Sequence, residues 1–136
     1  MAMDSPLARL ALTTKTLGHP ARLRILAMLR HNRLSVCQIA SVLQVAASTA
    51  SNYLNELRRA GLVSEQRQGK WVYYRLTDED PSGALLRFAL VLIGADPQVE
   101  QDALAAGRLN GTLPDIVCAT ISGGGCLPAP APDGGE

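Results

Sequence analysis

The chain has 136 residues and a net charge of +1, which is enough for one compact domain with a core and short for two. Its longest apolar stretch, ALLRFALVLIGA from Ala84, is about 12 residues long and contains an arginine, so it is too short to span a bilayer. Because no apolar run followed by a cleavage site opens the sequence, we expect a cytoplasmic protein with no membrane partner.

Positive charge is concentrated in the first part of the chain. Residues 1–76 hold eleven Lys and Arg against three Asp and Glu, a balance of +8, whereas the remaining sixty residues have a balance of −7. A division of this kind predicts that the first part faces a polyanion such as nucleic acid.

Apolar residues at helical spacing predict four helices before residue 61. The third begins at Ser35, whose hydroxyl can cap its first turn, and Gln38 three places on completes a capping box. A short break, QVAA, separates it from the fourth helix, which Gly61 ends. Two short helices on a tight turn predict a helix-turn-helix. The expected ranges are about 7–16, 20–32, 35–43 and 47–60.

The segment LVSEQRQGKWVYYRLT predicts a β-hairpin because β-branched and aromatic residues dominate both arms. Gly69 supplies a residue able to take positive φ at the turn. The tip carries Arg67 and Lys70, which suit phosphate or minor-groove contact.

After the hairpin, Pro81 opens a predicted helix to about Ile93, and a further helix starts near Asp96. Glycine and proline become frequent beyond Gly107. We therefore expect one folded domain over 1–106 and a Gly/Pro-rich C-terminal segment, 107–136, that carries two cysteines.

The order of these elements is that of a mainly α winged helix-turn-helix, α-α-α-α-β-β-α(-α), with the β-hairpin as the wing. The segments TLGHPARLRILAMLR, STASNYLNELRRAGLV and RQGKWVYYRL resemble the ArsR/SmtB family of metal-responsive repressors in order and spacing. The resemblance covers roughly residues 7–93. It implies a homodimeric repressor and not an enzyme. Such a repressor binds an imperfect palindrome of double-stranded operator DNA and dissociates from it when an inducer binds.

The N-terminal end of the fourth helix carries the polar groups that a recognition helix needs to reach base edges in the major groove. Ser48 could instead cap the helix, and Tyr53 could either contact DNA or pack beneath the helix. The candidate DNA-binding residues are Ser48, Thr49, Ser51, Asn52 and Tyr53 on the helix, and Arg67 and Lys70 on the wing.

The stretch GALLRFALVLIGA, which begins at Gly83, is apolar nearly all round, which demands burial on more than one side. A single small domain offers one core face. We therefore expect a homodimer, with the first helix as the second contributor to the interface; the alternative is an unusually hydrophobic core helix in a monomer.

Cys37 lies two residues after the Ser35 cap, where backbone N–H groups and the helix dipole favour its thiolate. Arsenic-sensing members of the resembled family place a Cys-x-Cys pair here, and Ser35 aligns with its first member. This chain departs from that pair, so the missing ligands must come from elsewhere, and Cys118 and Cys126 are the only other cysteines. Three thiolates from Cys37, Cys118 and Cys126 would suit a soft ion such as trivalent arsenic or antimony. Zinc is less suited, because it usually recruits a fourth ligand, and no organic cofactor is expected.

Other functions of the cysteines stay open. Each could be an apolar packing residue, or Cys118 could form a reversible redox-sensing disulfide with Cys126 or Cys37. A thiol enzyme is disfavoured, because the sequence has no Cys-x-x-Cys, no phosphate-cradling glycine loop and no histidine near a cysteine.

Overall fold

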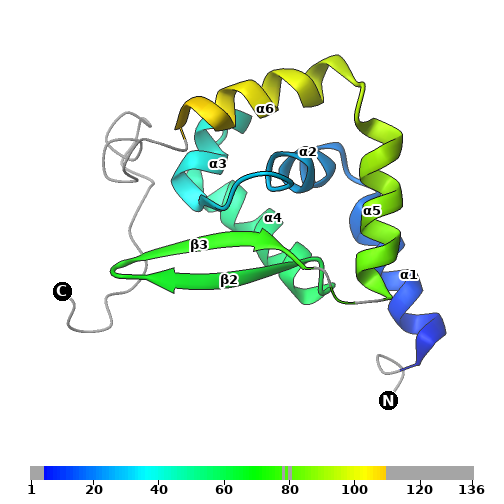
Figure 1. Ribbon diagram of the computed structural model, residues 1–136. Helices are drawn as coiled ribbons and strands as arrows, with labels where there is room; N and C mark the ends of the chain where they lie inside the picture. Colours follow the sequence, from blue (N-terminus) through cyan, green and yellow to red (C-terminus); the bar gives the residue numbers. More distant parts are fainter. Residues whose placement is uncertain (1–4, 78, 80, 110–136) are drawn as a thin grey trace.

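The computed structural model of the protein describes residues 5–77, 79 and 81–109, which form helices and one small sheet (Figure 1). The order of the elements confirms the predicted winged helix-turn-helix. The elements are α1 (Pro6–Leu17), α2 (Pro20–Met28), β1 (Leu34–Ser35), α3 (Val36–Leu43), α4 (Ala47–Arg59), β2 (Val63–Gln68), β3 (Trp71–Leu76), α5 (Ser82–Ile93) and α6 (Pro97–Leu109).

The core is centred on α2, which lies among the other helices (Figure 1). Ile25 and Leu26 of α2 and Leu54 of α4 are fully buried in one apolar cluster. Leu90 of α5 and Ala106 of α6 belong to the same cluster. Because one core joins the helix-turn-helix to both C-terminal helices, we expect these parts to fold together.

Local signals in the sequence set the ends of the helices. The N–H of Gln38 donates to Ser35 Oγ at 3.3 Å and the N–H of Ser35 donates to Gln38 Oε1 at 2.8 Å, which is the predicted capping box. Gln44 ends α3 in the left-handed region, with φ of 61°. Gly61 and Gly69 take positive φ after α4 and at the hairpin turn, as predicted.

The sheet has a strand that sequence patterning did not predict. β2 and β3 form the antiparallel hairpin, and the two-residue β1 pairs with the other side of β3, so the strand order is β1-β3-β2. Leu34 lies opposite Tyr74. The wing is thereby hydrogen-bonded to the residues that lead into α3.

Tyr74 is buried at the base of the hairpin, where its hydroxyl donates to Glu65 Oε2 at 3.3 Å. Burial disfavours the phenolate, and the Glu65 carboxylate adds to the effect, so the pKa of Tyr74 is raised to about 12. The ring therefore stays neutral throughout the physiological range.

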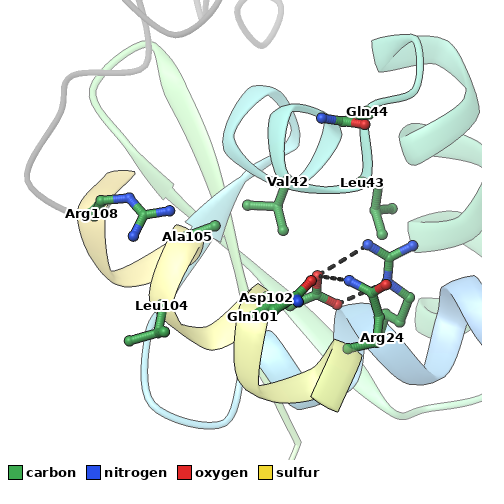
Figure 2. Close-up of a pocket in the computed structure, with 10 residues that line it drawn as sticks. Arg24, Val42, Leu43, Gln44, Gln101, Asp102, Leu104, Ala105 and Arg108 are labelled. Atoms are coloured by element: carbon green, nitrogen blue, oxygen red, sulfur yellow. Dashed lines mark hydrogen bonds and ion pairs between the residues drawn. The ribbon is translucent and has the colours of Figure 1, made fainter. Parts of the chain in front are cut away.

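α6 is fixed to α2 by a bidentate ion pair beside a cavity of about 530 Å³ (Figure 2). Arg24 Nε and Nη2 donate to the two carboxylate oxygens of Asp102 at 2.8 and 3.0 Å, and Gln98 Nε2 donates to Asp102 Oδ1 at 3.0 Å. The hydrogen bonds to Asp102 raise the pKa of Arg24 above its ordinary value, against the effect of partial burial. Both carboxylate oxygens of Asp102 therefore accept hydrogen bonds, and the pair fixes the position of α6.

Within the described residues, no single helix has both the length and the apolar character needed to cross a bilayer. α5 and α6 meet the two criteria only when they are taken together, as a pair bent by 107°.

Candidate nucleic-acid interface and thiol site

The start of α4 presents polar side chains to solvent. Ser48 and Asn52 are exposed one helical turn apart, and Thr49 and Ser51 are partly exposed beside them. Ala46 is the N-cap residue and makes no side-chain capping bond, so Ser48 does not cap the helix. The first turn of α4 thus has backbone N–H groups without a side-chain cap, and such groups at a helix N-terminus favour an anion such as phosphate.

For Tyr53 the sequence left open a contact with DNA or packing beneath the helix, and the structure describes its surroundings. It is partly buried against the core, and its ring centroid lies 5.1 Å from that of His19. His19 itself caps α2, since its Nδ1 accepts the N–H of Ala21 at 3.1 Å. The aromatic contact braces the recognition helix against the start of α2.

The hairpin carries exposed positive charge. Arg67 and Lys70 are exposed near its turn, with Lys70 Nζ 5.6 Å from the centre of the Trp71 ring. Both residues are placed where the sequence predicted them, at the end of the hairpin that lies farthest from the helices (Figure 1).

Arg33, which sequence reasoning did not single out, supports the wing from the loop before β1. Its guanidinium carbon lies 4.7 Å from the centre of the Tyr73 ring, and it hydrogen-bonds the side-chain oxygens of Gln66, at 3.4 Å, and of Gln68. These partners lie 33 to 40 residues away in the chain, so no local pattern could have found the contact.

Cys37 is the second residue of α3 and is 2% exposed. It packs in a small cluster with Val36, Ala47 and Leu109. Ala47 is the first residue of α4 and Leu109 is the last residue of α6. The sulfur therefore lies between the start of the recognition helix and the end of α6.

Cys37 is disulfide-bonded. The other two cysteines of the chain, Cys118 and Cys126, lie outside the described residues. Among residues 5–77, 79 and 81–109, no three His, Cys, Asp or Glu side chains come together as a metal site would require.

A family model described as bacterial regulatory protein, arsR family, matches residues 19–65. The biofilm growth-associated repressor of Agrobacterium fabrum is 36% identical over 97 residues, which are 71% of this chain and 81% of the relative. The chain belongs to the ArsR family. Arsenic resistance transcriptional regulator ArsR2 of Pseudomonas putida is a further ArsR-family relative, 30% identical over 106 residues, 76% of this chain and 92% of the relative.

Solved structures of similar proteins have the same fold. Reduced HlyU from Vibrio cholerae has a TM-score of 0.57 and 32% identity, covering 66% of this chain and 94% of that structure. A homodimeric winged helix-turn-helix DNA-binding domain from Mycobacterium bovis has a TM-score of 0.59 and 28% identity. The match covers 70% of this chain and 87% of that structure. This ArsR-family chain is therefore a DNA-binding transcriptional repressor and not an enzyme.

Proposed function

We propose that this ArsR-family repressor is a homodimer that binds its operator when Cys37 is reduced and releases it when Cys37 forms a disulfide. The observation that carries the proposal is the position of Cys37, which is disulfide-bonded, buried and in contact with the first residue of the recognition helix, Ala47. Disulfides in the cytoplasm, where we place the protein, are typically transient and regulatory.

In this proposal the helix-turn-helix domain of 1–106 binds DNA and dimerises, and segment 107–136 supplies the second sulfur from Cys118 or Cys126. The polar side chains at the start of α4 contact base edges and phosphates in the major groove, and the wing contacts the flanking backbone. Tyr53 supports α4 from below. The proposed contact residues are Ser48, Thr49, Ser51 and Asn52 on α4, and Arg67 and Lys70 on the wing.

The proposed dimer interface is an apolar face on α1 and α5. Its side chains are each more than half exposed in the single chain, and the three on α5 share one side of that helix. Exposed apolar surface of this kind marks an interaction site, and the homodimer from Mycobacterium bovis supports a second copy as its occupant. Twofold symmetry would set the two recognition helices about 34 Å apart, one turn of DNA. The face consists of Leu7, Leu10, Phe88, Val91 and Leu92.

Lys70→Ala should weaken operator binding and reduce its dependence on salt. Each lost phosphate contact lowers the slope of log K against log salt by about 0.9, so a dimer should lose about 1.8. Binding isotherms measured at several salt concentrations give this slope. Lys15, the other lysine of the chain, is exposed on α1, and Lys15→Ala is the matched control. If the slope falls equally in both variants, Lys70 does not contact DNA at the proposed interface.

A second candidate inducer is trivalent arsenic or antimony, held by the thiolates of Cys37, Cys118 and Cys126. The similarity to an arsenic resistance regulator of Pseudomonas putida favours it. Both candidates use the same cysteines and differ in what the sulfurs bond to: another sulfur in one case, a soft metalloid in the other.

Fluorescence anisotropy with a DNA fragment from the protein's own promoter separates the two inducers. We expect oxidised glutathione to release the DNA and a phosphine reductant to restore binding. Arsenite added in the presence of the phosphine tests the second candidate, and zinc serves as the control metal. Release by arsenite together with no response to oxidised glutathione would replace the disulfide proposal with the metalloid one.

A further inference from the structure

We infer that Arg33 is a positioning residue for operator binding, which holds the wing tip, residues 67–71, in the place where Lys70 meets DNA. The inference rests on the proposed contact between the wing and DNA, and it adds a residue from outside the hairpin to that contact. Arg33 is exposed in the loop before β1, two residues ahead of Ser35. Its role does not depend on the state of the cysteines.

The wing tip has less support than the base of the wing. β1 pairs with β3 only at Tyr73 and Tyr74. Nearer the turn, the ladder joins residues 67–68 to residues 71–72, and these pairs have no third strand beside them in the part of the chain that the structure describes. A two-stranded hairpin is marginally stable in water. The tip, which carries Lys70, therefore needs another contact to keep one position.

Arg33 supplies such a contact, because its side chain touches both strands of the hairpin. Its guanidinium carbon lies 4.7 Å from the centre of the Tyr73 ring on β3. On β2, Nη1 donates to Gln66 Oε1 at 3.4 Å, and Nη2 donates to Gln68 Oε1. Gln66 lies opposite Tyr73 in the ladder and Gln68 is two residues further on, so the three side chains share one face of the wing. Since Gln68 belongs to the last ladder pair before the turn, the contact reaches the tip.

The shape of the guanidinium matters here as well as its charge. It is planar, so its face can rest on the Tyr73 ring while its two terminal nitrogens bind two different amide oxygens. A lysine at position 33 would keep the positive charge but would lose this two-pronged contact. A wing that is loosened in this way must be ordered when DNA binds. The affinity then falls, although the number of phosphates contacted stays the same.

Arg33→Lys is expected to loosen the wing tip of the full chain before any DNA is added. Backbone order parameters of residues 67–71, measured by NMR relaxation, should fall from about 0.85 toward about 0.6. Arg75→Lys is the matched control, because Arg75 is exposed on the same face of β3, two residues from Tyr73. It should leave the order parameters unchanged. Equal values in wild type and Arg33→Lys would overturn the inference.

A double-mutant cycle connects the order of the wing tip to DNA binding. Arg33→Lys alone should weaken operator binding about 3- to 10-fold and keep the wild-type dependence on salt, since no charge is lost. In a Lys70→Ala protein the same change should lower affinity less than about twofold, because the wing no longer has a lysine to position. In an Asn52→Ala protein the loss should again be about 3- to 10-fold, because Asn52 lies on α4.

The cycle separates failure of this inference from failure of the proposed wing contact. Additive losses from Arg33→Lys and Lys70→Ala would overturn the inference and leave Lys70 as a DNA contact. A Lys70→Ala protein with the affinity and salt dependence of wild type would overturn the wing contact itself.

Gln68→Met carries the test if Arg33→Lys does not fold. It removes the oxygen that accepts from Arg33 Nη2 and leaves the arginine in place. The order parameters of residues 67–71 should fall in this variant too. Values equal to those of wild type would contradict support of the tip by Arg33.

Discussion

Leu92→Glu is expected to abolish the dimer and to weaken operator binding by about 100-fold or more. Leu92 is 69% exposed on the same side of α5 as Phe88 and Val91, within the proposed apolar face. A carboxylate placed there would have to be buried without a partner in each subunit, which costs several kcal/mol. A monomer contacts one half-site, so the gain from bivalent binding, about 10²–10⁴ in affinity, is lost.

Light scattering after gel filtration gives the mass, and anisotropy gives the operator affinity. Leu104→Glu is a close control, because Leu104 is 66% exposed but lies on α6, outside the apolar face. It should leave both mass and affinity unchanged. A dimeric Leu92→Glu protein with normal operator affinity would place the interface elsewhere.

Cys37→Ser is expected to keep the operator affinity of the reduced protein and to lose the response to oxidant. Serine is close to cysteine in size, so the small cluster with Ala47 should stay packed. Wild type should lose about 5- to 150-fold in affinity on oxidation, the usual range of coupling between two sites, whereas the variant should change less than about twofold. Anisotropy in reduced and oxidised glutathione measures both values.

The two remaining cysteines provide the internal comparison for this result. Whichever of Cys118→Ser and Cys126→Ser abolishes the response identifies the partner of Cys37, and the other should respond as wild type does. If oxidised glutathione released Cys37→Ser from the operator as fully as it releases wild type, the redox response would not pass through α3.

Much of the fold follows from short-range chemistry that is legible in the sequence. The Ser35 and Gln38 capping box, the positive φ of Gly61 and the Gly69 turn each depend on residues within four positions of one another. Such signals fix where helices and strands begin and end, and the order of the elements then predicts the winged helix-turn-helix.

The features that the sequence did not predict depend on contacts between distant residues. A two-residue strand such as β1 has no periodicity to detect, and it exists because β3 offers a free edge. The Arg24–Asp102 pair joins residues 78 apart, and the contact from Gln38 to Leu109 joins residues 71 apart. The burial of Cys37 against Ala47 likewise depends on how α3 and α4 pack, so spacing indicated a reactive thiol but not its neighbours.

Reciprocity gives the disulfide proposal a quantitative form. If the disulfide lowers operator affinity by a given factor, operator DNA must disfavour the disulfide by the same factor. Redox titrations with and without DNA should therefore be displaced from each other by the ratio of the two affinities.

The central claim, that the state of Cys37 sets operator affinity, is tested most directly by one titration of the wild-type protein bound to its operator. The ratio of reduced to oxidised glutathione is varied, and each sample is divided for anisotropy and for thiol alkylation. We predict that the fraction of DNA released follows the fraction of Cys37 in the disulfide across the whole range. DNA that stays bound while Cys37 is fully disulfide-bonded would contradict the account.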